Sequence, residues 1–307
     1  MPDALVDIGA MASLLDERYV EVVEMELQDN VDIRGMIYDV IPADRRTLRA
    51  SSIGEMAQVN EFTGQLAYDR PYEGYNVQGV PREFAVGLRI TQRMLEDDLT
   101  SIFEGDLFRP MVRASVTTVN KHASRLFNFA DADDTYFYTR SEALALASNA
   151  HTTRVAGVST ATGFDNLITT ALSPTNYRAA RIAMRQFRND RGELTDIVGD
   201  ELWVPIDLEP RAMEILESEK SPDTGNNAIN PERRTAKIMV NIHWNDTNNW
   251  ALMNGKLRKA NCKYLERVKV DYFRIKEFDT FQAKWAIRWR GGTQVRDWRF
   301  GLWAIVA

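Results

Sequence analysis

The stretch from Ile90 to Phe129 constrains the fold more than any other part of the sequence. Its apolar residues recur at steps of three and four, which is the spacing of one buried helical face. They are Leu99, Ile102, Phe103, Leu107, Met111, Val116, Val119, Ala123 and Leu126. At ~1.5 Å per residue, a helix approaching ~30 residues would be roughly 40 Å long. Gly105 and Pro110 interrupt the pattern, so we expect a short helix that leads into a long one, with a bend or break near these residues. By itself, the pattern is more typical of an ordinary core helix.

The end of the chain, from Lys263 onward, predicts β-strands. Apolar residues alternate with polar ones, as expected of strands with one buried face. The alternating residues are Val268, Val270 and Tyr272, then Trp285, Ile287 and Trp289, and finally Trp298, Phe300 and Leu302. We interpret Gly291-Gly292 as a tight hairpin turn. The helix predicted within 90–129 is the only element of matching length that can cover these strands, so the end of the chain should return to the middle.

Between Ser51 and Ile90 the sequence changes to a composition typical of turns and strands. Glycines and prolines exclude a helix, and the last seven residues alternate as a half-buried strand does. We therefore predict a long two-stranded hairpin. A free hairpin buries too little of itself to be stable in water, so its tyrosines need partners. These tyrosines are Tyr68, Tyr72 and Tyr75, and the sequence leaves open whether their partners lie on the same chain or on a neighbour.

A second unit, of mixed helices and strands, is predicted from about Asn166 to Asn254. Ser173 followed by Pro174 is a strong helix start, with a serine cap and a proline in the first turn. We expect that helix to end at 189–192 and a second helix to span 210–218. Short strands are expected at 202–206, 238–242 and 250–253. Because the C-terminal strands should pack beside the helix of the middle region, this unit is inserted into a discontinuous domain.

The N-terminal region predicts an acidic helix between Ala10 and Asn30. Its apolar residues have helical spacing, and its polar positions are rich in Asp and Glu. An ordinary surface helix and an arm that docks on a partner are equally compatible with this pattern. From Val31 to Ser52 we expect an extended connector, which contains Arg45 and Arg46.

The composition excludes several classes of protein. Cys262 is the only cysteine, and the three histidines show no ligand spacing, so neither disulfides nor a metal site is expected. The net charge of −6 argues against a dedicated nucleic-acid binder. No apolar run is long enough to span a bilayer, and the N-terminus lacks the pattern of a secretory leader. No catalytic motif is present, so we expect no enzyme and no cofactor, and a soluble enzyme of unknown substrate is only a remote alternative.

The order of these parts resembles the Hong Kong 97 fold of tailed-bacteriophage major capsid proteins. ITQRMLEDDLTSIFEGDL at 90–107 is similar to the family's passage from a returning strand through a short helix into its long spine helix. NIHWNDTNNWALMN at 241–254 is similar to a late strand of the family's A-domain. WRGGTQVRDWRFGLWAIVA at 289–307 resembles its last P-domain hairpin. The order of the parts carries more weight than any single motif.

The resemblance implies an α+β Hong Kong 97-type capsid fold with five segments. These are an N-terminal arm (N-arm) at 1–50, an E-loop hairpin at 51–90, a P-domain with the spine helix at 91–165, an inserted A-domain at 166–254, and C-terminal P-domain strands at 255–307.

The resemblance also implies a function, that of a major head protein. Many copies would assemble through hexamers and pentamers into an icosahedral shell around packaged double-stranded DNA, with only non-specific DNA contacts. The shell would form in the host cytoplasm and become part of the virion. Scaffolding, portal and cement or decoration proteins are the candidate partners, and no membrane is involved. The candidate inter-subunit contact residues are Leu14, Tyr19, Val23, Arg45, Arg46, Tyr68, Arg70, Tyr72 and Tyr75.

Two features separate this chain from the type member of that fold. The type member joins its subunits through an E-loop lysine, but 51–90 contains no lysine, so we expect noncovalent contacts. Because the sequence begins at Met1, we also expect no maturation cleavage. An encapsulin-type compartment shell is the alternative function, with the helix at 10–30 receiving cargo peptides.

Overall fold

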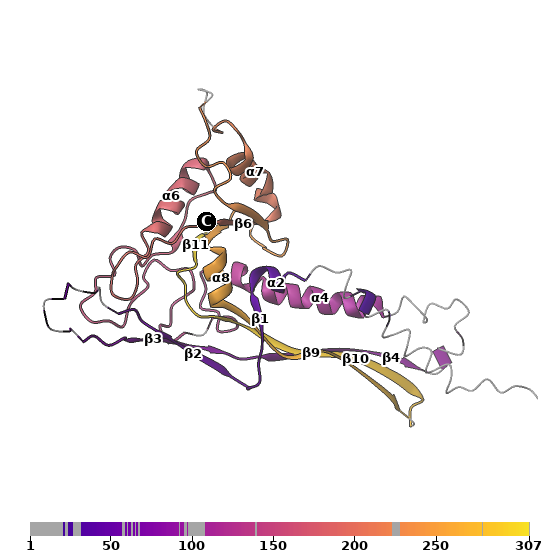
Figure 1. Cartoon of the computed structure of the whole chain (residues 1–307). Coiled ribbons are helices and arrows are strands. Elements are labelled where there is room, and N and C mark those ends of the chain that lie inside the picture. Colours follow the sequence, from indigo (N-terminus) through magenta and orange to yellow (C-terminus); the bar gives the residue numbers. More distant parts are fainter. Residues whose placement is uncertain are drawn as a thin grey trace, which may run out of the picture.

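The computed structural model of this chain contains two β-sheets and a projecting hairpin (Figure 1). It describes residues 21, 24–26, 32–56, 59, 61–62, 64, 66, 68–91, 93–94, 97, 108–138, 140–222, 228–277 and 279–306. A long four-stranded sheet extends to one side of the molecule, the hairpin extends to the other, and a unit with a five-stranded sheet stands above them. Among the described residues, no helix combines the length and the apolar character needed to cross a bilayer.

The four-stranded sheet brings together strands from three distant parts of the sequence. Its order is β1 (Asp39–Pro42), β9 (Cys262–Glu277), β10 (Gln282–Val295) and β4 (Arg82–Thr91). β9 and β10 form an antiparallel hairpin, β4 pairs antiparallel with β10, and β1 pairs parallel with β9. The predicted return of the C-terminal strands to the middle of the chain is therefore confirmed.

One helix, α4 (Arg109–Ala123), covers one face of this sheet. Every second residue of β10 between Ala283 and Trp289 is buried, and α4 packs against them. The cluster consists of Ile90, Phe108, Met111, Val112, Val119, Ala283, Trp285, Ile287 and Trp289. The helix thus covers the strands as predicted from their alternating pattern.

The described helix is shorter than the predicted one. α4 has 15 residues and begins at Arg109, with Pro110 in its first turn. Residues 98–107, where the N-terminal part of the long helix was expected, lie outside the described residues. At the other end, helical structure continues to Asn128, close to the predicted Phe129, but it is divided at Ser124. The division lies at Ser124, whose buried hydroxyl donates a hydrogen bond to Asn241 Oδ1 at 3.2 Å, and the short helix α5 (Arg125–Asn128) follows directly.

The predicted hairpin turn at Gly291-Gly292 is also wrong, because both glycines lie inside β10. The turn between β9 and β10 instead includes residues 279–281. A Cβ atom on Gly292 would lie 2.7 Å from the Val80 carbonyl oxygen, and one on Gly291 would overlap the Tyr264 ring. Glycine inside a strand often marks such a close approach, and here it lets the chain between β3 and β4 pass directly over β10.

The five-stranded sheet has the order β5 (Leu167–Ile168), β11 (Gly301–Ala304), β8 (Trp250–Met253), β6 (Glu201–Val204) and β7 (Lys237–Val240). Four of these strands come from the unit predicted at 166–254. The fifth, β11, comes from the C-terminal segment and lies between β5 and β8.

Helical segments accompany this sheet in the described part of the chain. α6 (Pro174–Arg185) begins as predicted, since the Ser173 side chain accepts a hydrogen bond from the Asn176 N–H at 3.2 Å. The 3₁₀ turn η2 (Ile206–Leu208) leads into α7 (Glu209–Glu217), close to the range predicted for the second helix. α8 (Gly255–Asn261) connects this sheet to β9.

A buried ion pair joins the two sheets. Arg258 of α8 donates two hydrogen bonds to the Glu201 carboxylate, at 2.8 and 3.0 Å, and a third to the Met36 carbonyl at 2.8 Å. Met36 belongs to α2 (Arg34–Ile37), which directly precedes β1. The segment predicted to be an extended connector, 31–52, therefore contains a helical turn and two strands in its described part. It is fixed to the body, because its carbonyl groups accept hydrogen bonds from a charged side chain of the core.

Candidate assembly surface

The hairpin is formed by β2 (Leu48–Ile53) and β3 (Glu73–Gly79). Its arms differ from those predicted within 51–90. The alternating segment up to Ile90 is β4, which pairs with β10 in the four-stranded sheet. The reason is that its apolar residues pack into the cluster around α4 and Trp289. The hairpin thus has two arms and a connecting segment, residues 54–72, which we call the hairpin loop.

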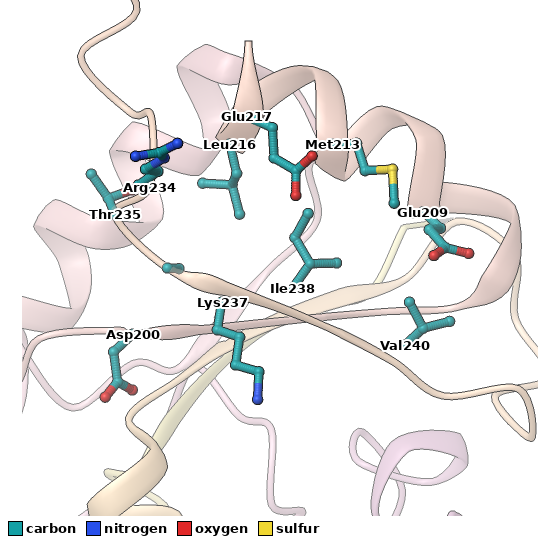
Figure 2. A pocket seen from close by; sticks show the side chains of 11 residues that line it. Asp200, Glu209, Met213, Leu216, Glu217, Arg234, Thr235, Lys237, Ile238 and Val240 are labelled. Carbon is teal, nitrogen blue, oxygen red and sulfur yellow. The ribbon is translucent and has the colours of Figure 1, made fainter. Parts of the chain in front are cut away.

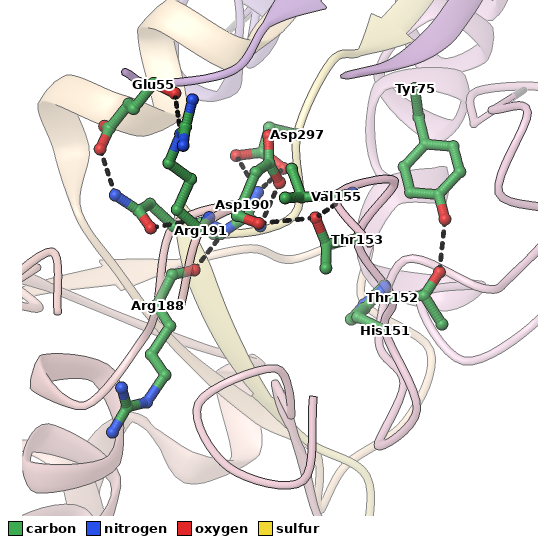
Figure 3. A network of polar contacts seen from close by, with 12 residues as sticks. Glu55, Tyr75, His151, Thr152, Thr153, Val155, Arg188, Asp190, Arg191 and Asp297 are labelled. Atoms are coloured by element: carbon green, nitrogen blue, oxygen red, sulfur yellow. Dashed lines mark hydrogen bonds and ion pairs between the residues drawn. The ribbon is translucent and has the colours of Figure 1, made fainter. Parts of the chain in front are cut away.

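Backbone and side-chain hydrogen bonds attach β3 to residues 140–154 of the same chain. Ser141 and Asn76 exchange two hydrogen bonds of 2.9 Å, one from each backbone N–H. The Tyr75 hydroxyl lies 2.6 Å from Thr152 Oγ1 (Figure 3). Arg154 donates to the Gly74 carbonyl at 3.2 Å. The hydroxyl of Tyr75, one of the three hairpin tyrosines, therefore has its partner on the same chain.

The loop that follows α6 attaches the hairpin loop to the body. Arg191 donates to the Glu55 carbonyl oxygen at 2.8 Å and to the Asp69 carboxylate at 2.5 Å. Its guanidinium lies 5.2 Å from the centre of the Tyr72 ring, which is within the range of a cation–π interaction. Asn189 hydrogen-bonds the Glu55 carboxylate (Figure 3). Arg191 thus binds both ends of the hairpin loop, and Asn189 binds the end at Glu55.

A cluster of buried charges supports this attachment. Arg299 contacts the carboxylates of Asp190 at 2.8 Å and Asp297 at 3.1 Å. Burial would raise the pKa of Asp297, but the positive charges of Arg299 and Arg140 outweigh burial and hold the pKa below its ordinary value. Asp190 directly precedes Arg191, so the ion pair with Arg299 fixes the backbone of the loop that holds the hairpin.

Glu142 forms the second half of this charge cluster. Its carboxylate lies 2.9 Å from Arg140 Nη1 and 3.4 Å from His151 Nδ1, and it accepts a hydrogen bond from the Thr152 N–H at 2.6 Å. Burial opposes ionisation of Glu142, but the hydrogen bond with His151 and the charge of Arg140 lower its pKa overall. Because Thr152 also contacts Tyr75, the cluster connects directly to β3.

The hairpin loop exposes many large apolar side chains. Val59 is 98 % exposed and Tyr68 92 % exposed. The exposed apolar residues of the hairpin and its loop are Ile53, Met56, Val59, Phe62, Leu66, Tyr68 and Tyr72. Single exposed apolar residues are common, but such a concentration on one projecting segment is typical of an interaction surface.

The predicted contact residues fall into three groups: residues that are exposed, residues that contact the body of the same chain, and residues outside the described part of the chain. Tyr68 and Arg70 are exposed on the hairpin loop, and Arg45 and Arg46 are exposed between β1 and β2. Tyr72 and Tyr75 contact the body of the same chain, as described above. The three candidates of the N-terminal helix lie outside the described residues; they are Leu14, Tyr19 and Val23.

Sequence reasoning missed the residues that hold the hairpin. Asn189 and Arg191 were interpreted only as part of a helix end, and nothing in their spacing indicates a contact with residues more than 100 positions away. Glu26 was missed as well. Its buried carboxylate pairs with Arg113 at 2.9 Å and with Arg109 at 3.6 Å, which ties the described part of the N-terminal region to α4.

Within the described residues, no three His, Cys, Asp or Glu side chains gather closely enough to hold a metal ion. Burial raises the pKa of the Cys262 thiol to about 12, so this cysteine is a neutral core residue in the folded chain.

The comparisons with known proteins point in one direction. The sequence model of a family described as phage capsid protein matches residues 77–304. No curated protein matches the sequence.

Solved structures with a similar fold include a capsid, a procapsid and a structure from a phage. The capsid of the native GTA particle has a TM-score of 0.59 and 13 % identity, and the match covers 90 % of each chain. The procapsid of bacteriophage JBD30 has a TM-score of 0.54 and 15 % identity, covering 97 % of this chain and 76 % of that one. A structure from Microbacterium phage Oxtober96 has a TM-score of 0.52 and 8 % identity, covering 91 % and 92 %.

Proposed function

This chain belongs to the phage capsid protein family, and from that premise we propose how its parts build a shell. It is a structural protein of a capsid and not an enzyme. Many copies associate in pentamers and hexamers, which close into an icosahedral shell that encloses double-stranded DNA. The shell forms in the host cytoplasm and becomes part of the virion.

We propose that the chain has the Hong Kong 97 arrangement of segments. The four-stranded sheet with α4 corresponds to the P-domain and its spine helix. The five-stranded unit corresponds to the A-domain, and β2, β3 and the hairpin loop correspond to the E-loop. The acidic N-terminal segment is the N-arm, and the ion pairs of Glu26 with Arg109 and Arg113 support its attachment beside α4.

The exposed hairpin loop is the observation that carries this proposal. Complete burial of one large apolar side chain contributes about 1.5–3 kcal/mol. The loop leaves several such residues in water, and a neighbouring subunit that covers them gains this free energy. Folding and assembly are then coupled by mass action, because the assembled state binds only the folded chain.

The contacts between subunits are noncovalent in this proposal. The segment 51–90 contains arginine but no lysine, so an E-loop lysine cannot supply a crosslink. The predicted contact residues Tyr68, Arg70 and Tyr72 belong to the hairpin loop, while Arg45 and Arg46 pair with acidic residues of a neighbour or with DNA phosphates. Scaffolding, portal and cement proteins are the further partners we propose.

Electron microscopy of the purified protein tests the proposal. We expect uniform polyhedral particles, and we expect the double variant Phe62→Ser, Tyr68→Ser to remain as free subunits or small oligomers. Ile229→Ser is the matched control, since Ile229 is 86 % exposed but lies far from the hairpin in the sequence. A wild-type protein that remains monomeric at high concentration contradicts the proposal.

A further inference from the structure

His151 lies in the buried charge cluster beside the hairpin, and both of its ring nitrogens face oxygen atoms. Nδ1 lies 3.4 Å from the Glu142 carboxylate, and Nε2 lies 3.2 Å from the Leu146 carbonyl oxygen. A carbonyl oxygen and an ionised carboxylate accept hydrogen bonds and donate none. A ring that serves both oxygens must therefore donate from both nitrogens.

Only the protonated ring has two N–H donors. Neutral imidazole carries one N–H, so each of its two tautomers points a nitrogen lone pair at one of the oxygens. Both oxygens have further donors, since Asn166 Nδ2 binds the Leu146 carbonyl at 2.9 Å and Arg140 binds Glu142. The cost of the neutral ring is therefore repulsion between lone pairs, and the fully buried side chain of His151 has no water to screen it.

The charges around His151 also favour the protonated ring. Burial raises the pKa of Asp165, and a positive charge on His151 acts against this rise. Within the part of the chain that the structure describes, the charged groups of this cluster are the carboxylates of Glu142, Asp165, Asp190 and Asp297 and the guanidinium groups of Arg140 and Arg299. The Tyr138 phenol beside Arg140 adds no charge, because burial raises its pKa to about 12. Carboxylates outnumber guanidinium groups, so a positive ring reduces an excess of negative charge.

The face of the His151 ring is covered by an aromatic side chain. The Trp298 indole stacks on the imidazole with 4.3 Å between ring centres. An indole face attracts a cation. Arg299 lies 4.8 Å from the centre of the same indole, but its charge is paired with Asp190 and Asp297. The stack therefore accommodates a positive imidazole ring.

The carboxylate that faces His151 also holds the hairpin. Glu142 Oε1 accepts hydrogen bonds from the Thr152 N–H at 2.6 Å and from the Thr152 hydroxyl at 3.2 Å. Because this hydroxyl donates to Glu142, it accepts its 2.6 Å hydrogen bond from the Tyr75 hydroxyl of β3 (Figure 3). Arg140, bound to the other oxygen of Glu142, lies 5.1 Å from the centre of the Tyr75 ring. A shift of Glu142 is therefore transmitted to Tyr75.

We propose that protonation of His151 tightens the attachment of β3 to residues 140–154 and that loss of this proton loosens it. The protonated ring holds the Glu142 carboxylate in line with Thr152 and Tyr75. The neutral ring repels one of its two oxygens, and the segment that carries Thr152 moves away from the hairpin. The attachment is stronger below the ordinary pKa of histidine, about 6.5, and weaker above it. This proton-dependent clasp is a property of the single chain and goes beyond the proposed function.

Amide hydrogen exchange of the dissociated, full-length subunit at about pH 5.5 and about pH 8.5 tests the clasp. Glu142 stays ionised at both values, because the hydrogen bond with His151 and the charge of Arg140 outweigh burial and lower its pKa. Each rate is divided by the rate of an unstructured chain at the same pH, which gives a protection factor. We expect protection of residues 48–53 and 73–79 to be about three- to tenfold greater at the lower pH. The helix α6 is the internal reference and should show equal protection factors.

Two histidine variants separate the clasp from other effects of pH. His151→Phe retains an aromatic ring against Trp298 but has no N–H, so its hairpin protection should be equal at the two pH values. His243→Gln is the matched control, because the Asn128 side chain binds the backbone carbonyl of His243 and this contact remains. It should keep the wild-type dependence. Equal protection in the wild type, or a persistent dependence in His151→Phe, overturns the inference.

Nuclear magnetic resonance of the ring nitrogens decides the question if His151→Phe does not fold. The chain has three histidines, and burial together with nearby positive charges lowers the pKa of both His122 and His243. Their rings therefore lose their protons at lower pH than an ordinary histidine. In the wild type, loss of the His151 ring proton should follow the same pH curve as hairpin protection, and curves that differ overturn the inference. These measurements use the single subunit, so their failure leaves the proposed shell function intact.

Discussion

The Arg191 guanidinium lies 2.5 Å from the Asp69 carboxylate and joins the loop after α6 to the hairpin loop, across 122 residues of sequence. The same group binds the Glu55 carbonyl and lies over the Tyr72 ring. One planar side chain thus holds both ends of the hairpin loop. A loop that is ordered before it meets a neighbour loses less conformational entropy on binding, so this attachment favours assembly.

Replacement of Arg191 by alanine should loosen the hairpin without unfolding the chain. We expect faster amide hydrogen exchange at residues 53–56 and 68–72 in the dissociated subunit, measured by mass spectrometry. The free energy of unfolding should fall by no more than about 1–2 kcal/mol, because the groups involved are partly exposed to solvent. Arg185→Ala is the control, since Arg185 lies 3.9 Å from Asp196 and does not contact the hairpin loop. Unchanged exchange in Arg191→Ala would contradict the attachment.

Replacement of Arg258 by methionine should destabilise the whole chain. Arg258 is 1 % exposed, and the change removes its two hydrogen bonds to the Glu201 carboxylate and its hydrogen bond to the Met36 carbonyl. Loss of one partner from a buried pair typically costs about 3–5 kcal/mol. Urea unfolding of the dissociated subunit measures this loss. Arg211→Met is the control, because Arg211 and Glu214 form a more exposed pair on α7, for which we expect less than about 1 kcal/mol.

Replacement of Gly292 by alanine tests the explanation for the glycine pair in β10. The new methyl group would lie 2.7 Å from the Val80 carbonyl oxygen, so the chain before β4 must shift. Overpacking of this kind typically costs about 1–3 kcal/mol. Gly35→Ala is the counterpart: it lies in α2 with no atom within 4 Å of the added carbon, and should be neutral or stabilise by up to about 1 kcal/mol. Equal thermal midpoints for the two variants would refute the explanation.

The buried charge cluster that contains Asp297 and Glu142 should make the free energy of unfolding depend on pH in the acid range. The folded-state pKa values of Asp297 and Glu142 lie below their ordinary values of 3.8 and 4.5. For each carboxylate, at a pH between its folded-state pKa and its ordinary pKa, the unfolded chain binds more protons than the folded chain. The stabilisation by the carboxylate is therefore fully present above its ordinary pKa, and it is lost as the pH falls through its folded-state pKa.

Thermal unfolding between pH 3 and pH 7 measures this dependence. We expect a nearly constant midpoint above about pH 5 and a steep decrease below about pH 4. Asp297→Asn removes one of the two carboxylates, so it should lower the midpoint at neutral pH and make the decrease in acid shallower. An identical acid slope in the variant would show that Asp297 is not a source of the dependence.

The sequence alone was sufficient where local patterns decide the structure. Ser173 and Pro174 begin α6, and β8 spans the four residues predicted for it, because caps, prolines and apolar periodicity act over a few residues. The alternation of Trp285, Ile287 and Trp289 also correctly predicted a strand with one face covered by α4. Membership of a capsid family followed from the order of these elements along the chain, and the family match confirms it.

Local patterns were misleading where the cause lies far away in the sequence. Gly291 and Gly292 have the composition of a turn, but their role depends on Tyr264 and on the chain at Val80. The segment ending at Ile90 alternates like a hairpin arm, and it joins β10 because an apolar cluster is available there. A one-dimensional pattern predicts that a face is buried, but not which element buries it.

The sequence by itself determined the elements, their apolar faces, the absence of lysine in 51–90 and the kind of protein to which the chain belongs. Only the tertiary structure decided that Arg191 holds the hairpin loop and that Arg258 joins the two sheets. It also decided that α6 and α7 lie on opposite flanks of the five-stranded sheet, where α7 and β7 border the pocket of Figure 2. The physical reason is the distance along the sequence over which each kind of interaction acts. Helix caps and periodicity depend on neighbours within a few residues, whereas ion pairs and close backbone contacts depend on positions that only the folded chain brings together.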